Sequence, residues 1–420
     1  MKQYFRNMSF TSRPRRDLWL VVVAKSVSLL GDEVAALALT LRLQAHGAGP
    51  AAVAALLIAA LVPLIVLAPL VGRLVDGHDS RTLLAGSSLV QGALCALLAF
   101  QGSTPAILLL VAALGCGQAV NGATWQALLP GIAGREGLPR AMGISQAGAT
   151  VASIAAPALA GLLFAAYGVR VPLLLDAATF LAITIGALLV TTRHGRAHVA
   201  AEPGGSGSTA AAPVTTGLGI MRRDPLLRTL LLLLALFAGL GSMVNVVDVF
   251  LVRGTLHASA TWYGVSGAAL AVGMLVASVT AGRLRGDGAL ARWFVISLLV
   301  LAAGLLGSAA VPNVYALIPL SALIGAANGV LNVTLGSLVM GRAAAEVRGR
   351  VAAALSGIAS AAQLAAYVLG GALGVALTPR EIFAIGGGLG LLAPLVLGRR
   401  LIRATAPLPQ PSRVAADWAA

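Results

Sequence analysis

Twelve long apolar stretches, separated mostly by short polar or glycine-rich connections, dominate the hydrophobic pattern of the chain. A helix needs about 20 apolar residues to cross a bilayer core of about 30 Å, and open strands cannot satisfy their backbone polar groups in lipid. The pattern predicts an all-α integral membrane protein. The predicted spans are residues 17–45, 50–75, 82–101, 105–129, 141–168, 171–191, 227–252, 260–284, 289–311, 314–340, 350–376 and 381–402.

One long hydrophilic connection, residues 192–226, divides these spans into two groups of six. It contains the run Pro203–Ser208, whose glycine and serine content is typical of a flexible linker. We therefore expect four segments. They are an N-terminal six-helix bundle with its tail (1–191), a central loop (192–226), a C-terminal six-helix bundle (227–402) and a C-terminal tail (403–420).

The two halves are related by a repeat with a spacing of 210 residues. Gly115 recurs as Gly325, and Gly161 recurs as Gly371. A polar helix face recurs at the same spacing. Duplicated halves with matched polar faces are how secondary transporters place a substrate path between two repeats, so the repeat predicts pseudo-symmetric bundles. The polar face comprises Gln146, Thr150, Ser153 and Pro157 in the first half and Ser356, Ser360, Gln363 and Tyr367 in the second.

Charge is scarce and unevenly distributed. Only 10% of residues are charged, against about 25% in soluble proteins, and the net charge is +15. If the N-terminus is cytoplasmic, 24 of the 29 Lys and Arg fall in the even connections and the tails. This positive-inside pattern places both termini in the cytoplasm and argues against nucleic-acid binding. Arginine outnumbers lysine 27 to 2, which fits a GC-rich bacterial genome, so we expect the bacterial inner membrane.

The remaining sequence excludes several functional classes. No phosphate-binding loop ending in Gly-Lys-Ser/Thr is present, which argues against an ATP-driven pump. We find no nucleophile–base arrangement and no room for a soluble catalytic domain, so we expect no enzyme activity. Cys95 and Cys116 are too few for a disulfide framework or a metal site, and we expect no cofactor. A secondary transporter remains the preferred class.

The connection between the second and third spans carries a recognisable motif. The signature Gly-x-Leu-x-Asp-Arg-x-Gly-Arg-Lys/Arg is matched at Gly72, Leu74, Asp76 and Arg81, whereas positions 77, 79 and 80 depart from it. With twelve spans in two halves, the chain resembles the major facilitator superfamily. Four further segments resemble its macrolide-efflux and siderophore-export (enterobactin-exporter-like) branch: Ser28–Asp32, Ala156–Gly161, Leu173–Phe180 and Val347–Val351.

This resemblance implies roles for two groups of residues. The first would gate the cytoplasmic side, with Asp76 holding the ends of spans two and eleven together. The second, Pro157 and Gly161, lies in a segment similar to the antiporter motif Gly-Pro-x-x-Gly-Gly, with alanine in place of two glycines, and would form a tight contact that prevents leak. The alternatives are a solvated loop and ordinary helix packing. The gating group comprises Gly72, Asp76, Arg81, Arg348 and Arg350.

Carboxylates within the spans are the candidates for proton coupling. Ionised groups in a bilayer are expensive and usually face a water-filled cavity, where they function. Asp32 is the first candidate and Glu33 the second; they point about 100° apart on a helix, so one at most faces a cavity squarely. Asp248 is the third candidate. The alternatives are a structural ion pair for Asp32 and a surface salt bridge between Asp248 and Arg253.

Polar side chains in spans one, four, five, seven, ten and eleven are the candidates for lining a substrate cavity. The resemblance implies that spans one, four, seven and ten line it. The alternatives are hydrogen bonds between helices, packing of Trp125, and a Lys25 side chain that reaches the cytoplasmic interface. The candidates are Lys25, Gln118, Asn121, Trp125, Gln146, Thr150, Asn245, Asn328, Asn332, Ser360 and Gln363.

The sequence thus predicts a monomeric transporter that exports small, partly apolar organic compounds in exchange for protons. A rival interpretation is a dedicated exporter of one self-made metabolite or siderophore. A rival of another class is a membrane receptor or assembly scaffold that transports nothing.

Overall fold

The computed structural model describes residues 13–189, 225–342 and 348–404, and these residues are helical apart from short turns. The predicted central loop and the outer parts of both tails lie largely outside the described residues. The α-helices are α2 (Arg13–Ala45), α3 (Pro50–Val66), α4 (Ala68–Gly77), α5 (Ser80–Leu98), α6 (Thr104–Tyr167), α7 (Arg170–Leu189), α9 (Pro225–Val249), α10 (Ala260–Ala281), α11 (Asp287–Ala310), α12 (Val314–Arg342), α13 (Arg348–Ala376) and α14 (Pro379–Ala404); a π-helix, η1 (Phe250–Thr255), follows α9.

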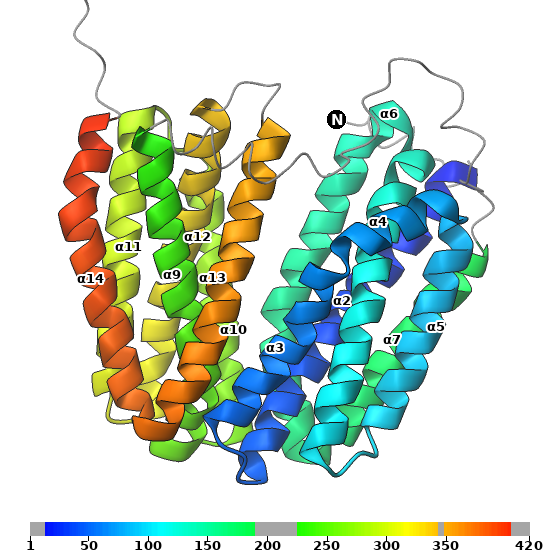
Figure 1. Cartoon of the computed structure of the whole chain (residues 1–420), viewed down its shortest axis with the longest axis horizontal. Coiled ribbons are helices and arrows are strands. Elements are labelled where there is room, and N and C mark those ends of the chain that lie inside the picture. The colour runs from blue at the N-terminus through cyan, green and yellow to red at the C-terminus, as the bar shows by residue number, and fades with distance from the viewer. Residues whose placement is uncertain (1–12, 190–224, 343–347, 405–420) are drawn as a thin grey trace, which may run out of the picture.

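These helices form two bundles, which Figure 1 shows side by side. Helices α2–α7 make the N-terminal bundle and α9–α14 the C-terminal bundle. Within the described residues, ten segments are long and apolar enough to cross a membrane, and the bent pair α3–α4 is an eleventh. Helix α2 is the twelfth predicted span; Lys25, Asp32, Glu33 and Arg42 make it more charged than the others. The predicted all-α, two-bundle membrane fold is confirmed.

Two connections differ from the sequence prediction. The second span was expected to be one helix, residues 50–75, but it bends by 53° at Leu67. Pro69 explains the break, because a proline lacks an N–H and its ring clashes with the carbonyl four residues earlier. The fourth and fifth spans, Thr104–Leu128 and Ala141–Tyr167, are joined by helical backbone instead of a loop.

Local caps fix where several helices begin. Asp79 precedes α5 and accepts hydrogen bonds from the backbone N–H of Thr82 (3.3 Å) and from its hydroxyl (3.0 Å). An N-cap of this kind stabilises a helix by about 1 kcal/mol, which gives a structural reason for aspartate where the superfamily signature has glycine. Thr378 and Glu381 form a reciprocal capping box at the start of α14.

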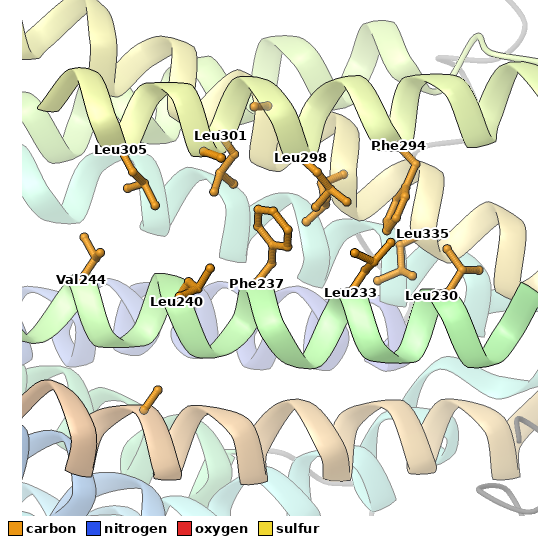
Figure 2. Close-up of a cluster of buried hydrophobic side chains, with 14 of the residues drawn as sticks. Leu230, Leu233, Phe237, Leu240, Val244, Phe294, Leu298, Leu301, Leu305 and Leu335 are labelled. Carbon is orange, nitrogen blue, oxygen red and sulfur yellow. The ribbon is translucent and has the colours of Figure 1, made fainter. Parts of the chain in front are cut away.

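A continuous apolar core holds the C-terminal bundle together. Figure 2 shows the side chains of α9 and α11 meeting between the two helices. Phe294 and Leu230 are almost fully buried, and Leu335 from α12 contributes to the same cluster. Lipid tails are as apolar as leucine, so close packing, more than removal of surface from water, is what favours this association.

The 210-residue repeat is expressed in the contacts between helices. A Cβ added to Gly115 would lie 2.9 Å from the carbonyl of Ala60, and one on Gly325 would collide with the carbonyl of Leu270, which is Ala60 shifted by 210. Between the bundles, Gly161 packs on Ala260 and Gly264, and Gly371 packs on Pro50 and Ala54, again shifted by 210. The predicted pseudo-symmetry is therefore a property of the fold.

The two bundles touch at one end, called here the contact end, and Figure 1 shows them separating toward the other end, where α14 ends. At the contact end one apolar cluster includes residues of both bundles, among them Leu41 and Val252. The Nε of Arg253 also donates a 2.8 Å hydrogen bond to Oε1 of Gln44 across the boundary. The positive-inside pattern predicts that the separated end is cytoplasmic, so this conformation would be open inward.

Candidate functional site

Polar and charged side chains gather inside the N-terminal bundle around Asp32. The Asp32 carboxylate lies within interaction range of the side chain of Gln118 of α6 and of Lys25, two turns earlier on α2. The neighbouring Glu33 is exposed, as expected from the angle between successive helical side chains. The structure thus brings Asp32, Gln118 and Lys25 together.

Asp176 in α7 is a member of this group that the sequence analysis did not select. It is 3% exposed and interacts electrostatically with both Asp32 and Lys25. Its Oδ2 accepts a hydrogen bond from the thiol of Cys95 (3.3 Å), and its Oδ1 accepts one from the hydroxyl of Thr179 (3.3 Å). We call Lys25, Asp32, Gln118 and Asp176 the charged cluster. It contains two carboxylates and one ammonium group, so its charges do not cancel when all are ionised.

Gly31 has no side chain, and Asp176 occupies the space that a side chain at this position would fill. A Cβ at Gly31 would lie 2.5 Å from Oδ1 of Asp176 and 2.9 Å from Oγ1 of Thr179. We expect Gly31→Ala to lower stability by about 1–3 kcal/mol, the usual cost of overpacking, because both neighbours must move. Thermal unfolding in detergent, followed by circular dichroism, measures this. Gly122→Ala is the control, since nothing lies within 4 Å of its added Cβ; equal stability of the two variants would contradict the prediction.

Two other candidates of the N-terminal bundle lie in packing contacts. Asn121 is fully buried, and its Nδ2 donates to Oγ of Ser88 (3.2 Å) and Oε1 of Gln91 (2.9 Å) on α5. This is the interhelical hydrogen bonding that stood as the alternative to a cavity role. Trp125 is 8% exposed and packs among apolar side chains, with Lys25 lining the same small space.

A cavity of about 520 Å³ lies in the C-terminal bundle. Four sequence-predicted residues line it together: Asn245 and Asp248 from α9, Asn328 from α12 and Gln363 from α13. Cavities of about 300–1,000 Å³ hold drug-sized ligands. The other lining residues are Phe237, Ala238, Gly241, Ser242, Val244, Ser266, Gly267, Leu270, Leu301, Leu305, Ser308, Leu317, Ser321, Ile324, Ala359 and Phe383.

Hydrogen bonds hold the amides of this cavity in place. The Nε2 of Gln363 donates to the hydroxyl of Tyr367 (2.8 Å), and Tyr367 is also hydrogen-bonded to Asn245. The Nδ2 of Asn332 donates to the side chain and to the carbonyl oxygen of Asn328, one turn earlier. Asn328 is thereby oriented by a residue that does not itself line the cavity.

The three remaining cavity candidates do not line this space. Ser360 is half-buried on α13, one residue after Ala359 of the lining. Gln146 is exposed on α6, and its backbone carbonyl accepts a 2.9 Å hydrogen bond from the hydroxyl of Thr150. The first-half copy of the polar face is therefore separate from the cavity formed by the second half.

The predicted gating residues lie at the separated end. Gly72 and Asp76 are exposed on α4, and Arg350 is exposed near the start of α13. The guanidinium of Arg81 donates to the backbone carbonyl of Leu188 in α7. The side chain of Arg348 lies outside the described residues. The contact between spans two and eleven that the family role requires belongs to the opposite conformation and stays a prediction.

The predicted antiporter motif lies between the bundles. Pro157 and Gly161 face α10, where Gly264 approaches the backbone of both residues and Gly267 packs on the Pro157 ring. Small residues let two helices approach closely enough for backbone contact. Within the described residues no three His, Cys, Asp or Glu side chains gather as metal ligands.

Two bundles, paired glycine contacts between them and an internal polar cavity define a membrane transporter of the two-repeat class. The chain belongs to the Major Facilitator Superfamily, whose family model matches residues 21–286 and 247–419. No curated protein sequence matches the chain significantly. Members of this superfamily bind small-molecule substrates within a membrane, which makes the protein a multi-pass transporter instead of an enzyme.

Solved structures agree with this assignment at the level of the fold. A mutant of the nucleoside transporter NupG superposes with a TM-score of 0.71 at 11% identity, covering 92% of this chain and 99% of that one. A bacterial homologue of the human lysosomal transporter Spinster, inward-facing and unoccupied, gives 0.67 at 13% identity, covering 94% and 96%. A bacterial homologue of the iron transporter ferroportin, inward-facing, gives 0.66 at 16% identity, covering 93% and 99%.

Proposed function

We propose that this chain is a proton-coupled exporter of small, partly apolar organic compounds, working by alternating access in the bacterial inner membrane. Both termini would be cytoplasmic and the monomer would be the working unit. The observation that carries the proposal is the cavity of about 520 Å³, whose wall is mostly apolar with a few amides and hydroxyls. Ligand sites for drug-sized molecules have this composition.

The charged cluster supports proton coupling. Asp32 and Asp176 are two carboxylates with one nearby ammonium group, Lys25, so neutrality is reached when one proton is bound. The cluster is in the N-terminal bundle and the cavity in the C-terminal bundle. Rocking of the bundles about the contact end would couple the two sites, because it would switch the access of both sites from one side of the membrane to the other at the same time.

The packing of Pro157 and Gly161 against α10 supports exchange over simple facilitation. A backbone-to-backbone contact leaves no space for water between α6 and α10 at this point. Protons and substrate would then cross only when the bundles change conformation. Export against a gradient follows from inward proton flow, to which the membrane potential adds about 2.3 kcal/mol per charge per 100 mV.

The test is substrate-driven proton movement in proteoliposomes containing the full chain, read with a trapped pH-sensitive dye. A panel of antibiotics and siderophores is added to vesicles with an imposed pH gradient, and protein-free vesicles are the control. We expect at least one compound to accelerate proton movement. A compound that crosses without moving protons would overturn the coupling, and movement of one siderophore alone would favour the dedicated exporter.

A further inference from the structure

The cavity in the C-terminal bundle has a single charged group in its wall. Among the described residues that line it, Asp248 is the only ionisable side chain; the other polar members are serines and the amides of Asn245, Asn328 and Gln363. Amides and hydroxyls are uncharged and do not select for the charge of a ligand. The carboxylate of Asp248 is therefore the group that gives the cavity a negative charge. It faces the same space as the apolar side chains of Phe237 and Leu301.

The arginine closest to Asp248 in sequence is engaged elsewhere. Arg253, five residues later in η1, donates from Nε to Gln44 of the N-terminal bundle at the contact end. This contact replaces the salt bridge that the sequence analysis held as an alternative role for Asp248. Tyr263 of α10, whose phenol side chain is 7% exposed, lies within electrostatic range of Asp248.

A carboxylate in an apolar wall favours a ligand of opposite charge. Burial away from water strengthens the attraction between unlike charges, and a buried carboxylate without a counter-ion is costly. The rings of Phe237 and Phe383 line the same cavity and add apolar surface against which the body of an organic cation can pack. A ligand with an apolar body and one positive charge therefore matches both the apolar wall and the single carboxylate.

We propose that this cavity binds monovalent organic cations whose charged centre pairs with Asp248. The inference rests on the proposed function in that the cavity is taken as the substrate site, although binding is measurable without transport. Anions of the same shape are disfavoured because they would meet the same carboxylate. Neutral molecules bind through the apolar wall and amides alone, and bind more weakly.

Tetraphenylphosphonium and tetraphenylborate, nearly isosteric ions of opposite charge, test this directly. Their binding to the purified full chain in detergent is measured by equilibrium dialysis. Micelles take up the two ions unequally, so the readout is the change between wild type and Asp248→Asn. We expect the affinity for the cation to fall about tenfold or more, as for loss of a charge-assisted contact, and the affinity for the anion to hold or rise.

Two further variants keep this test decisive. Asp79→Asn makes the same chemical change outside the cavity and preserves an N-cap, so the cation affinity should stay at the wild-type value. Asp248→Glu keeps the charge and should retain most of the affinity even if Asp248→Asn fails to fold. A cation affinity that is the same in wild type and Asp248→Asn would overturn the proposal.

The outcome is separable from that of the proposed function. If the cation binds through Asp248 but no compound moves protons, the binding site stands and the proton-coupled exporter fails. If neutral or anionic compounds drive proton movement and the cation shows no dependence on Asp248, the exporter stands and the cation site fails.

Discussion

Asp32→Asn should abolish substrate-driven proton movement and leave binding in the C-terminal cavity intact. Asparagine keeps the size and polarity of the side chain beside Gln118, but it cannot take up and release a proton. The substitution also leaves Asp176 as the one carboxylate of the charged cluster within electrostatic range of Lys25, which removes the unbalanced negative charge of the cluster. We therefore expect the dye signal in proteoliposomes to fall to that of protein-free vesicles, while the affinity for tetraphenylphosphonium is unchanged.

This result would separate two carboxylates by function. Asp248→Asn should weaken binding of the cation, and Asp32→Asn should remove only the proton movement that accompanies transport. Asp79→Asn is the matched control, because it makes the same chemical change outside the charged cluster and preserves the N-cap of α5. If Asp32→Asn moves protons at the wild-type rate with any substrate, the coupling group is elsewhere and Asp176 becomes the residue to replace.

The helices and the repeat could be read from the sequence because both follow from local rules. Backbone groups in lipid must be satisfied within one segment, so apolar length predicts a helix directly. The glycines at 115, 161, 325 and 371 were visible as a repeat, and each one now has a close neighbour at the repeat-related position. The bend at Leu67 was missed although Pro69 marks it, because the apolar pattern continues through the break.

The grouping of site residues was only partly predictable. Asn245, Asp248, Asn328 and Gln363 were selected because polar groups in apolar helices tend to face inward, and they line one cavity. Asp176 was missed although an acid within a span is itself a signal of function. Its partner Cys95 is 81 residues away on another helix, so the contact that buries Asp176 depends on the packing of α5 against α7.

The conformation, by contrast, could not be predicted from the sequence. Both halves carry a polar face at equivalent positions, yet the cavity of about 520 Å³ is lined by residues of the second half, with Gln363 in its wall. Gln146, in the first-half face, is exposed and does not line that cavity. Which side chains line a cavity depends on how the bundles lean and on side-chain volume at each position, and a pattern of residue types contains neither.

Gly264→Val should shift the protein away from this conformation and toward one that is open at the contact end. A Cβ at Gly264 would collide with the carbonyl oxygen of Pro157 and lie 3.0 Å from the Cα of Gly161. These are backbone atoms, so no rotamer change can relieve the clash and the two bundles must separate there. Overpacking costs about 1–3 kcal/mol, and each 1.4 kcal/mol changes an equilibrium about tenfold, so we expect roughly a tenfold change in the population ratio.

Spin labels at Tyr167 and Val375, which are exposed and end α6 and α13 at the contact end, measure this shift as a longer distance between bundles. Cys116 is replaced by serine in every variant, since it is the accessible native thiol. Gly122→Val is the control, because a Cβ there meets nothing within 4 Å. An unchanged distance in a folded Gly264→Val variant would mean that the backbone contact yields locally, and the glycine pair would then have no part in keeping the contact end closed.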